Sequence, residues 1–321
     1  MPSSLNAPQL QNEKAAFAYV EARVWPNGPV CPHCGNSERI YVIESKPDAK
    51  TKVRYGVKKC GACRKQFTVR VGTVFESSHV PLHIWLQAIA LVTSSKKGIS
   101  SNQLSRVLGV TLKTAWFMSH RIREAMRSGD MTPFGGEGTP VEVDETYIGT
   151  IQGAEVKRGG YMHKHKVLSL VDRASGAARS YVISEFKLRT VAPILEANVA
   201  REARLMTDEA PMYKHVGWNF ADHGVVNHGR DEYVSRQDGT IHTNTIEGFF
   251  SVFKRGMKGV YQHCEGKHLH RYLAEFDFRY SNRVALGVDD HERADRALKG
   301  IVGKRLTYRR PDGGAEAALC A

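Results

Sequence analysis

The stretch that decides the fold is HTNTIEGFFSVFKRGMKG, residues His242–Gly259. Its apolar residues recur at intervals of three or four, which is the spacing of a helix that buries one face. They are Ile246, Phe249, Phe250, Phe253 and Met257. Glu247 and Lys254 are seven residues apart, so they stack two turns apart on a neighbouring face, too far for the usual intrahelical ion pair. The pattern predicts a helix anchored on one side, whose other side is either simply solvated or presents a carboxylate and an ammonium to a ligand.

Composition limits the classes of protein to consider. Of the 321 residues, 41% are hydrophobic and 25% charged, as in globular proteins long enough to bury a core. The formal net charge of +13 predicts an anionic partner, with nucleic acid the leading candidate and an anionic membrane surface the competitor. No stretch approaches the ~18 unbroken apolar residues of a spanning helix, and the first residues lack the pattern of a secretory signal. We therefore expect a cytoplasmic, nucleoid-associated protein with no membrane segment.

Four of the six cysteines form two C-x-x-C pairs: Cys31 with Cys34, and Cys60 with Cys63. In a reducing compartment such pairs indicate metal before disulfide. The segments 39–44 and 52–59 predict a hairpin that brings both pairs to one tetrahedral Zn²⁺; the alternative is four free buried cysteines. Four thiolates close the coordination shell, so we predict a structural zinc and give His33 no ligand role. Residues 52–70 hold seven basic and no acidic residues, which form either a phosphate-contacting surface or a solvated face.

The region after these cysteines predicts helices. Residues 81–93 have the apolar content of a buried helix, and residues 100–126 read as two short helices joined by a turn at Gly109. Ser100 and Thr111 are the predicted N-caps. This is the helix-turn-helix pattern, for which a generic helix-packing unit is the alternative. Three basic residues of the second helix are predicted to point outward toward DNA: Lys113, Arg121 and Arg123.

Past residue 140 the predicted order is three strands, helix, strand, short helix, strand, and then the helix within residues 242–259. The predicted strands are 141–149, 166–172, 179–184, 204–207 and 222–226, and the further helices are 190–200, a turn from Pro211, and 267–283. Antiparallel strands followed by alternating helix and strand predict a layered α/β domain. This is the element order of the ribonuclease H-like fold.

Three acidic residues lie on elements that such a fold brings together. Asp144 lies on the first strand, Asp208 at the end of the fourth, and Glu247 on the later helix. A carboxylate cluster repels itself unless cations occupy it, and hard oxygen ligands favour Mg²⁺ or Mn²⁺. Two such ions about 3.5–4 Å apart can activate an attacking oxygen and stabilise a leaving oxygen at phosphorus. The alternative is three unrelated acids at caps and strand ends.

Five motifs carry a resemblance to a known family. They are WPNGPVCPHCG (Trp25–Gly35), VDETYIG (Val143–Gly149), TDEA (Thr207–Ala210), HTNTIEGFFSVFKRGMKGVY (His242–Tyr261) and EFDFRYSNR (Glu275–Arg283). With them the chain resembles the DDE transposases of bacterial insertion sequences, ISXO type, that carry an N-terminal zinc ribbon. The resemblance extends from the cysteine pairs almost to the C-terminus.

The resemblance implies roles for particular residues. Asp144, Asp208 and Glu247 would be the metal-binding triad, and Lys254 would contact the transposon end. Some branches of the group have asparagine at the third position, which here would be Asn244. We predict Glu247, because a carboxylate binds Mg²⁺ more strongly than an amide does, with Asn244 and His242 as supporting residues.

The mechanism that the resemblance implies is phosphoryl transfer with two catalytic Mg²⁺ or Mn²⁺ ions. Water would cut the element's terminus to release a 3′-hydroxyl, which would attack target DNA. Lys254, Arg255 and Lys258 would hold phosphates, and the zinc ribbon with the helix-turn-helix would recognise the terminal inverted repeats. A homo-oligomer on DNA is expected. The alternatives are a non-catalytic DNA-binding regulator, which includes a domesticated transposase remnant, and a nuclease acting on branched DNA or hybrids.

The chain is accordingly predicted to have four parts. Residues 1–75 would hold an N-terminal helix and the zinc ribbon, and residues 76–132 a helix-turn-helix-like DNA-binding domain. Residues 140–300 would form the ribonuclease H-like catalytic domain, and residues 301–321 a C-terminal tail.

Overall fold

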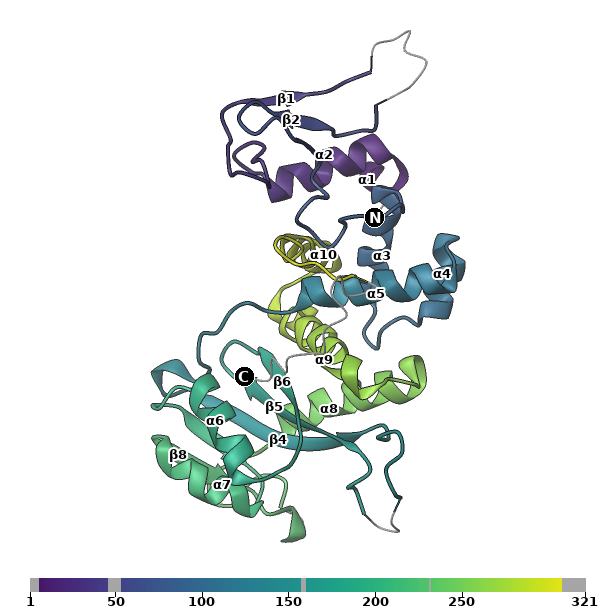
Figure 1. Ribbon diagram of the computed structural model, residues 1–321. Helices are drawn as coiled ribbons and strands as arrows, with labels where there is room; N and C mark the ends of the chain where they lie inside the picture. The colour runs from purple at the N-terminus through teal and green to yellow at the C-terminus, as the bar shows by residue number, and fades with distance from the viewer. Residues whose placement is uncertain (1–5, 46–52, 157–159, 231, 308–321) are drawn as a thin grey trace. The chain divides into compact units, whose positions relative to one another are not determined.

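A computed structural model describes residues 6–45, 53–156, 160–230 and 232–307 (Figure 1). By internal contacts the chain divides into two compact units. The first unit comprises residues 1–89, 104–125 and 298–321, and the second comprises residues 90–103 and 126–297. The predicted boundaries of the four parts stay predictions.

The first unit begins with two helices and a small sheet. These elements are α1 (Pro8–Gln11), α2 (Glu13–Val24), β1 (Ile40–Val42), β2 (Lys58–Cys60) and β3 (Gln66–Phe67). Asn12 caps α2, because its side chain accepts a hydrogen bond of 3.1 Å from the backbone N–H of Ala15. The predicted hairpin is confirmed as the antiparallel pair β1–β2, and β3, which was not predicted, pairs with β2. Residues 46–52, part of the predicted second hairpin strand, lie outside the described residues.

Three helices follow: α3 (Leu82–Ser94), α4 (Ser101–Leu108) and α5 (Leu112–Met126). Both predicted N-caps are confirmed. The hydroxyl of Ser100 accepts from the backbone N–H of Gln103 at 3.1 Å, and that of Thr111 accepts from the N–H of Thr114 at 3.2 Å. Gly109 turns the chain between α4 and α5 with φ +65°, a conformation that costs little without a Cβ.

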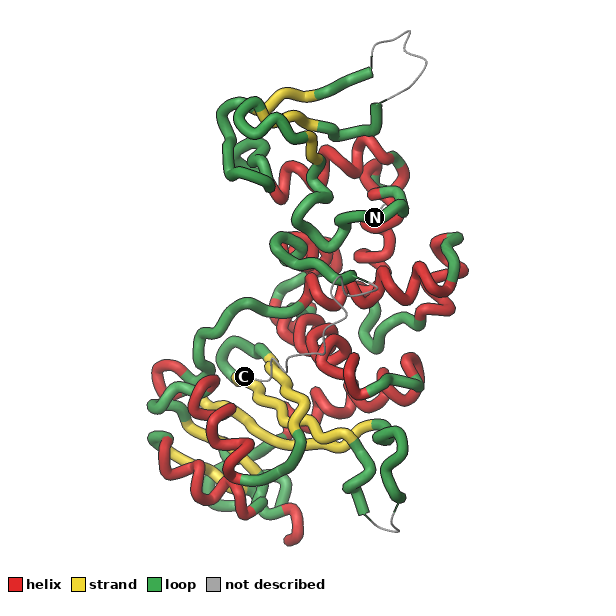
Figure 2. The backbone as a smooth tube through the Cα atoms, viewed as in Figure 1, coloured by secondary structure: helices red, strands yellow, loops and turns green. Residues whose placement is uncertain are grey.

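The second unit contains a five-stranded mixed sheet in the order β6-β5-β4-β7-β8, drawn in yellow in Figure 2. Its strands are β4 (Pro140–Ile148), β5 (His165–Asp172), β6 (Ala178–Ile183), β7 (Arg204–Thr207) and β8 (Asp222–Val225). The first three strands pair antiparallel, whereas β4 pairs parallel with β7, and β7 with β8. The first strand is therefore central, and the fourth lies beside it. This confirms the predicted ribonuclease H-like fold.

Helices cover both faces of this sheet (Figure 1). They are α6 (Leu188–Asn198) and α7 (Pro211–Val216) on one face, and α8 (Asn244–Gly256) and α9 (Gly266–Ser281) on the other. Alternating residues of β5 supply both cores: Leu168 and Leu170 pack with α6 and α7, while Val167 and Val171 pack with α8 and α9. Burial on both faces explains why β5 is a nearly continuous apolar run.

The apolar stripe predicted within residues 242–259 is confirmed, because all five of its residues are buried. Its last residue, Met257, begins a π-helical segment, η5 (Met257–Tyr261), that continues α8. Gly256 precedes this segment at a close approach. A Cβ there would lie 2.4 Å from the Phe276 ring and 2.6 Å from the carbonyl oxygen of Lys97, so only glycine fits.

The remaining elements are short or were not predicted. They are α10 (Asp290–Lys299) and the 3₁₀ turns η2 (Gly136–Gly138), η3 (Gly217–Asn219), η4 (His228–Arg230) and η6 (Val284–Leu286). Within the first unit, the carbonyl oxygen of Ile301 accepts a hydrogen bond from the N–H of Val74, and Val302 forms an antiparallel β-bridge with Thr73. Within the described ranges no helix has the length and apolarity needed to cross a membrane.

Candidate functional site

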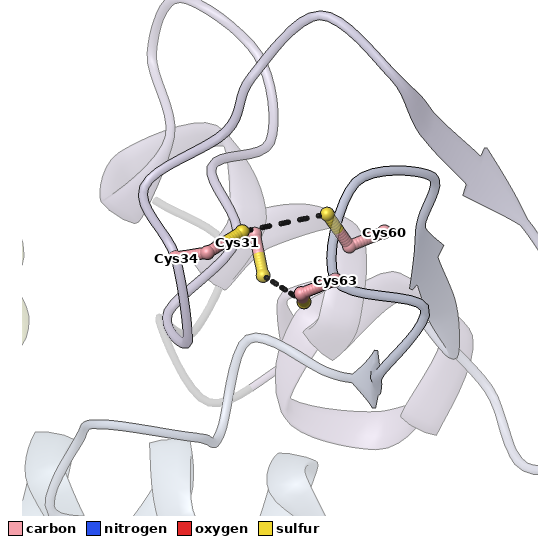
Figure 3. A group of neighbouring side chains, drawn as sticks. All are labelled: Cys31, Cys34, Cys60 and Cys63. Atoms are coloured by element: carbon pink, nitrogen blue, oxygen red, sulfur yellow. Dashed lines mark hydrogen bonds between the residues drawn. The ribbon is translucent and has the colours of Figure 1, made fainter.

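The four cysteines of the first unit converge on one point, as Figure 3 shows. The Sγ atoms of Cys31 and Cys63 are 3.7 Å apart, and those of Cys34 and Cys60 are 3.6 Å apart. Four sulfurs bound tetrahedrally to zinc at about 2.3 Å would be separated by about 3.8 Å. The donor set therefore fits a structural Zn²⁺.

The basic residues of the ribbon divide into two groups. Lys58 is buried and pairs with Glu21 at 2.5 Å, and Arg70 pairs with Glu13 at 3.1 Å, so both stabilise the unit itself. The members that remain exposed are Arg54, Lys59, Arg64 and Lys65. Among the basic residues of 52–70 that the structure describes, this exposed group is available to DNA phosphates.

The structure corrects the prediction for two of the three basic residues on α5. Lys113 is exposed, as expected. Arg121 is buried, and its guanidinium donates to the carbonyl oxygens of Val74, Glu76 and Leu306. Arg123 is also buried and donates to the Ser119 hydroxyl at 3.0 Å.

The outward prediction is wrong for both residues: Arg123 is buried with its guanidinium on Ser119 of the same helix, and Arg121 is buried against chain segments far from α5 in sequence. Their carbonyl oxygens satisfy a guanidinium that helical spacing alone places at the surface.

In the second unit the parallel pairing of β4 and β7 brings two predicted acids together. The register places Glu142 opposite Met206, so two residues further along each strand Asp144 lies beside Asp208. One carboxylate oxygen from each of Asp144, Glu145 and Asp208 lies within 4.8 Å of the other two. We call these three residues the acidic cluster.

Sequence reasoning missed Glu145. Strand alternation points it to the opposite face from Asp144, toward α7, where the Tyr213 hydroxyl donates to its carboxylate at 2.5 Å. Its oxygen nevertheless reaches Asp144 and Asp208 at the end of the sheet. The signal that could have found it is the adjacent acid in the motif VDET.

Glu247 lies in the first turn of α8 and borders the acidic cluster. Its Oε1 is 3.4 Å from the Thr243 hydroxyl and 3.5 Å from Nε2 of His228, and 41% of the side chain is exposed. It is close enough to Asp144 to influence that carboxyl electrostatically. Asn244 is exposed at the first position of the same helix.

The acidic cluster holds its protons unusually tightly. Burial raises the pKa of Asp144 to about 8, and the neighbouring carboxylates of Glu145, Asp208 and Glu247 add to this shift. Burial likewise raises the pKa of Glu145 to about 7, and it raises the pKa of Asp208. A divalent cation would offset this repulsion, and an all-oxygen donor set fits Mg²⁺ or Mn²⁺.

A buried ionic clamp ties the start of α8 to β4. Glu142 is fully buried, two residues before Asp144, and accepts from the backbone N–H of Ile246 at 2.8 Å and from Nε of Arg173 at 2.5 Å. Arg173 also donates to the carbonyl oxygen of His242 at 2.6 Å, and the ring of His242 lies 3.3 Å from Glu142. The clamp thereby holds the residue before Glu247 against the strand that carries Asp144.

Basic side chains lie after Glu247 in the last turn of α8 and on η5. Lys254 is half-buried; burial lowers its pKa, and the carboxylate of Asp144 opposes this shift, so the two lie within electrostatic reach. Lys258 is exposed on η5. Arg255 is exposed and folds back onto Ser251, donating to its hydroxyl at 2.6 Å.

Comparisons with known proteins match two parts of this chain. Residues 136–281 match the model of the ISXO2-like transposase domain, and residues 11–66 match that of the transposase zinc-ribbon domain. An uncharacterized protein in transposable element ISH50 of Halobacterium salinarum is 28% identical over 292 residues, which cover 84% of this chain and 91% of that protein.

A solved structure also matches, the cryo-EM structure of the simian T-cell lymphotropic virus intasome in complex with PP2A regulatory subunit B56 gamma. The match covers 54% of this chain and 63% of that one, with 12% identity and a TM-score of 0.28. A likeness at this TM-score supports no inference about the present site.

Proposed function

We propose that this chain is the DDE transposase of an insertion sequence, because residues 136–281 match the ISXO2-like transposase domain and residues 11–66 match the transposase zinc-ribbon domain. It would cut DNA at the ends of its element and join those ends to target DNA. The observation that carries this proposal is the acidic cluster, in which three carboxylates each bring an oxygen within 4.8 Å of the others. Burial and mutual repulsion raise the pKa values of Asp144 and Glu145, a cost that bound cations would offset.

The catalytic residues of the proposal are Asp144, Asp208 and Glu247, with Glu145 as a fourth carboxylate. Asp144 is central, because it lies beside Asp208 and is influenced by both glutamates. Two divalent ions held here would activate the attacking oxygen and stabilise the leaving oxygen at phosphorus. Glu142 and Arg173 act as positioning residues through the N-terminus of α8, and His242 supports them as a member of the same clamp.

Lys254, Lys258 and Arg255 would hold DNA phosphates next to the acidic cluster. Lys254 has a particular place among them, because it lies within electrostatic reach of Asp144 while half-buried. A cation there neutralises a phosphate that would otherwise be repelled by the four acids. The exposed basic residues of the ribbon, together with Lys113, would bind the terminal inverted repeats.

The proposal includes the partners and the four-part organisation predicted from the sequence. The substrates are the two terminal inverted repeats and target DNA, reached in the cytoplasm. Two ends must react together, so a homo-oligomer on DNA is expected.

The test is cleavage of the DNA that flanks the gene, in Mg²⁺, by the natural chain and by Asp144→Asn, Asp208→Asn, Glu145→Gln and Glu247→Gln. Binding of the same DNA is measured in parallel by gel shift. Nicks at the element ends that are lost in Asp144→Asn, with binding retained, support the transposase. Cleavage that persists in all four variants contradicts it, and binding without cleavage by the natural chain favours the non-catalytic regulator. Comparing Glu247→Gln with Asn244→Ala identifies which of the two supplies the third ligand.

A further inference from the structure

Two tyrosines stack on each other where β4 ends. The rings of Tyr147, on β4, and Tyr161, in the loop before β5, have centroids 4.8 Å apart and planes 23° apart. Phe186 supports this pair edge-on, with its centroid 5.2 Å from that of Tyr147. Tyr147 is thus packed from two sides, whereas 54% of Tyr161 is exposed. A large aromatic ring held rigidly at the surface is a ready stacking partner for a flat ligand.

The tyrosine pair lies next to the acidic cluster. Tyr147 follows Glu145 by two residues on the same strand, so both side chains point to the same face. By strand geometry the pair therefore borders the site proposed to hold the scissile phosphate.

Lysines surround the exposed ring. Nζ of Lys164 lies over Tyr161 at 4.9 Å from the ring centroid. Burial is the main cause that lowers the pKa of Lys254, and the charges of Lys258 and Lys164 lower it further. The three ammonium groups therefore lie near one another. Aromatic rings interleaved with cations are the composition of surfaces that bind single-stranded nucleic acid.

We propose that Tyr161, supported by Tyr147, stacks on an unpaired DNA base next to the phosphate held at the acidic cluster. The proposal rests on the transposase function proposed above. Bases inside a duplex are already stacked on each other, so a protein ring can receive one only where the strand is locally opened. The structure thus assigns this site to a frayed or extruded base at the cut, and the stacking is indifferent to base identity.

Lys164 has to move off the Tyr161 ring before a base can stack on it. Its ammonium is carried on a flexible four-carbon stem, and a DNA phosphate is a stronger partner for it than a phenol ring. When a nucleotide binds, the Lys164 ammonium moves to the phosphate, and the base stacks on the face of the Tyr161 ring that Lys164 has left. Lys164 therefore covers the ring in the free protein and neutralises the backbone in the complex.

The probe is a duplex of arbitrary sequence with a short single-stranded overhang that carries 2-aminopurine, a fluorescent base quenched by stacking. A blunt duplex with the same base paired serves as the reference. Both are titrated with the full chain in Ca²⁺, which takes oxygen ligands as Mg²⁺ does. We expect the natural chain to quench the overhang.

We expect Tyr161→Leu, which keeps an apolar contact with Tyr147 but has no aromatic face, to lose the quenching. It should bind the overhang roughly 5- to 150-fold more weakly, with blunt-duplex affinity unchanged. Tyr161→Trp should restore both signals. The matched control is Trp218→Leu, because Trp218 is 73% exposed in the same unit and packs edge-on against His215. This control should behave as the natural chain does.

Two results overturn the proposal: quenching and overhang affinity of Tyr161→Leu equal to those of the natural chain, or equal losses on overhang and blunt duplexes. A second measurement separates it from the proposed function. If the natural chain quenches the fluorescence of the overhang but cuts no DNA in Mg²⁺, the proposed transposase function is contradicted and the proposed stacking site is supported. If cutting depends on Asp144 while Tyr161→Leu still quenches, the stacking site alone fails.

Discussion

The four-thiolate site and the acidic cluster are assembled from the chain in opposite ways. The cysteines come as two local pairs on adjacent turns, and their sulfurs already stand 3.6–3.7 Å apart, at the spacing of a closed tetrahedral shell. The three carboxylates of the acidic cluster come from two segments far apart in the sequence, Asp144 and Glu145 on β4 and Asp208 just after β7, and partial burial raises their pKa values. The first arrangement fits a metal that stabilises the fold around it, whereas the second carries the cost of crowded carboxylates, which the proposed divalent ions would offset.

The largest expected effect lies at the four-thiolate site. Replacing Cys31 or Cys60 by Ser should remove the zinc, whose binding contributes on the order of 10 kcal/mol to folding in small zinc domains. The first unit should then lose its structure while the second keeps its own. Metal content per chain should fall from about one zinc to about none, and limited proteolysis should cut the first unit. A variant that retains zinc and resists protease would show that the four thiols are not its ligands.

The next largest effect is expected at the clamp, in which Glu142 and Arg173 hold the start of α8 against β4. Glu142→Ala leaves Arg173 and the Ile246 N–H without their buried acceptor, so the free energy of unfolding should fall by about 3 kcal/mol. Glu142→Gln keeps one acceptor and should lose less. Chemical denaturation measures both variants, and equal stability of Glu142→Ala and the natural chain would exclude the clamp.

Asp144→Asn should separate function from stability. Metal-dependent cleavage should fall by at least about a hundredfold, above the 10- to 100-fold typical of residues that only support ligands. Without added Mg²⁺ and at about pH 9, where the Asp144 carboxyl of the natural chain is ionised, the same variant should melt at a higher temperature than the natural chain, because an amide removes a half-buried negative charge. The cysteine variants should melt at a lower temperature. If Asp144→Asn also melts lower, the cluster is not under repulsive strain.

The smallest predicted effect is a pH dependence of stabilisation by Mg²⁺. The folded pKa of Asp144, about 8, and that of Glu145, about 7, lie above their ordinary values, so the folded state binds protons more tightly than the unfolded state. The stability of the Mg²⁺-free protein should therefore fall as pH rises from about 4 to about 8. Mg²⁺ binds the carboxylates, so its stabilising effect should grow over the same range.

This is measured by melting temperatures with and without Mg²⁺ at about pH 5 and about pH 9, without chelators, which would also strip zinc. Asp144→Asn is the control and should lose most of the pH dependence. An equal Mg²⁺ effect at both pH values would place the ion elsewhere.

Patterns local in the chain were enough to predict much of this molecule. The cysteine pairs, the two N-caps, the strand β7 and the buried stripe of α8 follow from spacings of two to seven residues, over which backbone geometry fixes direction. The predicted element order grouped Asp144 with Asp208, whose carboxylates the structure brings within 4.8 Å, and the role of Glu247 beside them stays a prediction. The third ribbon strand and α10 were missed, because two residues of strand and a polar helix give weak signals.

The sequence by itself determined which residues could bind metal, because a cysteine pair, or an acid at the end of a predicted strand, can be recognised within one short segment. Only the tertiary structure decided which of them meet and what covers them. Glu145 joins Asp144 across the edge of the sheet, and the Arg121 guanidinium is buried against carbonyl oxygens 45 or more residues away in the chain. Contacts of that range are set by how the elements pack, and no local periodicity encodes them.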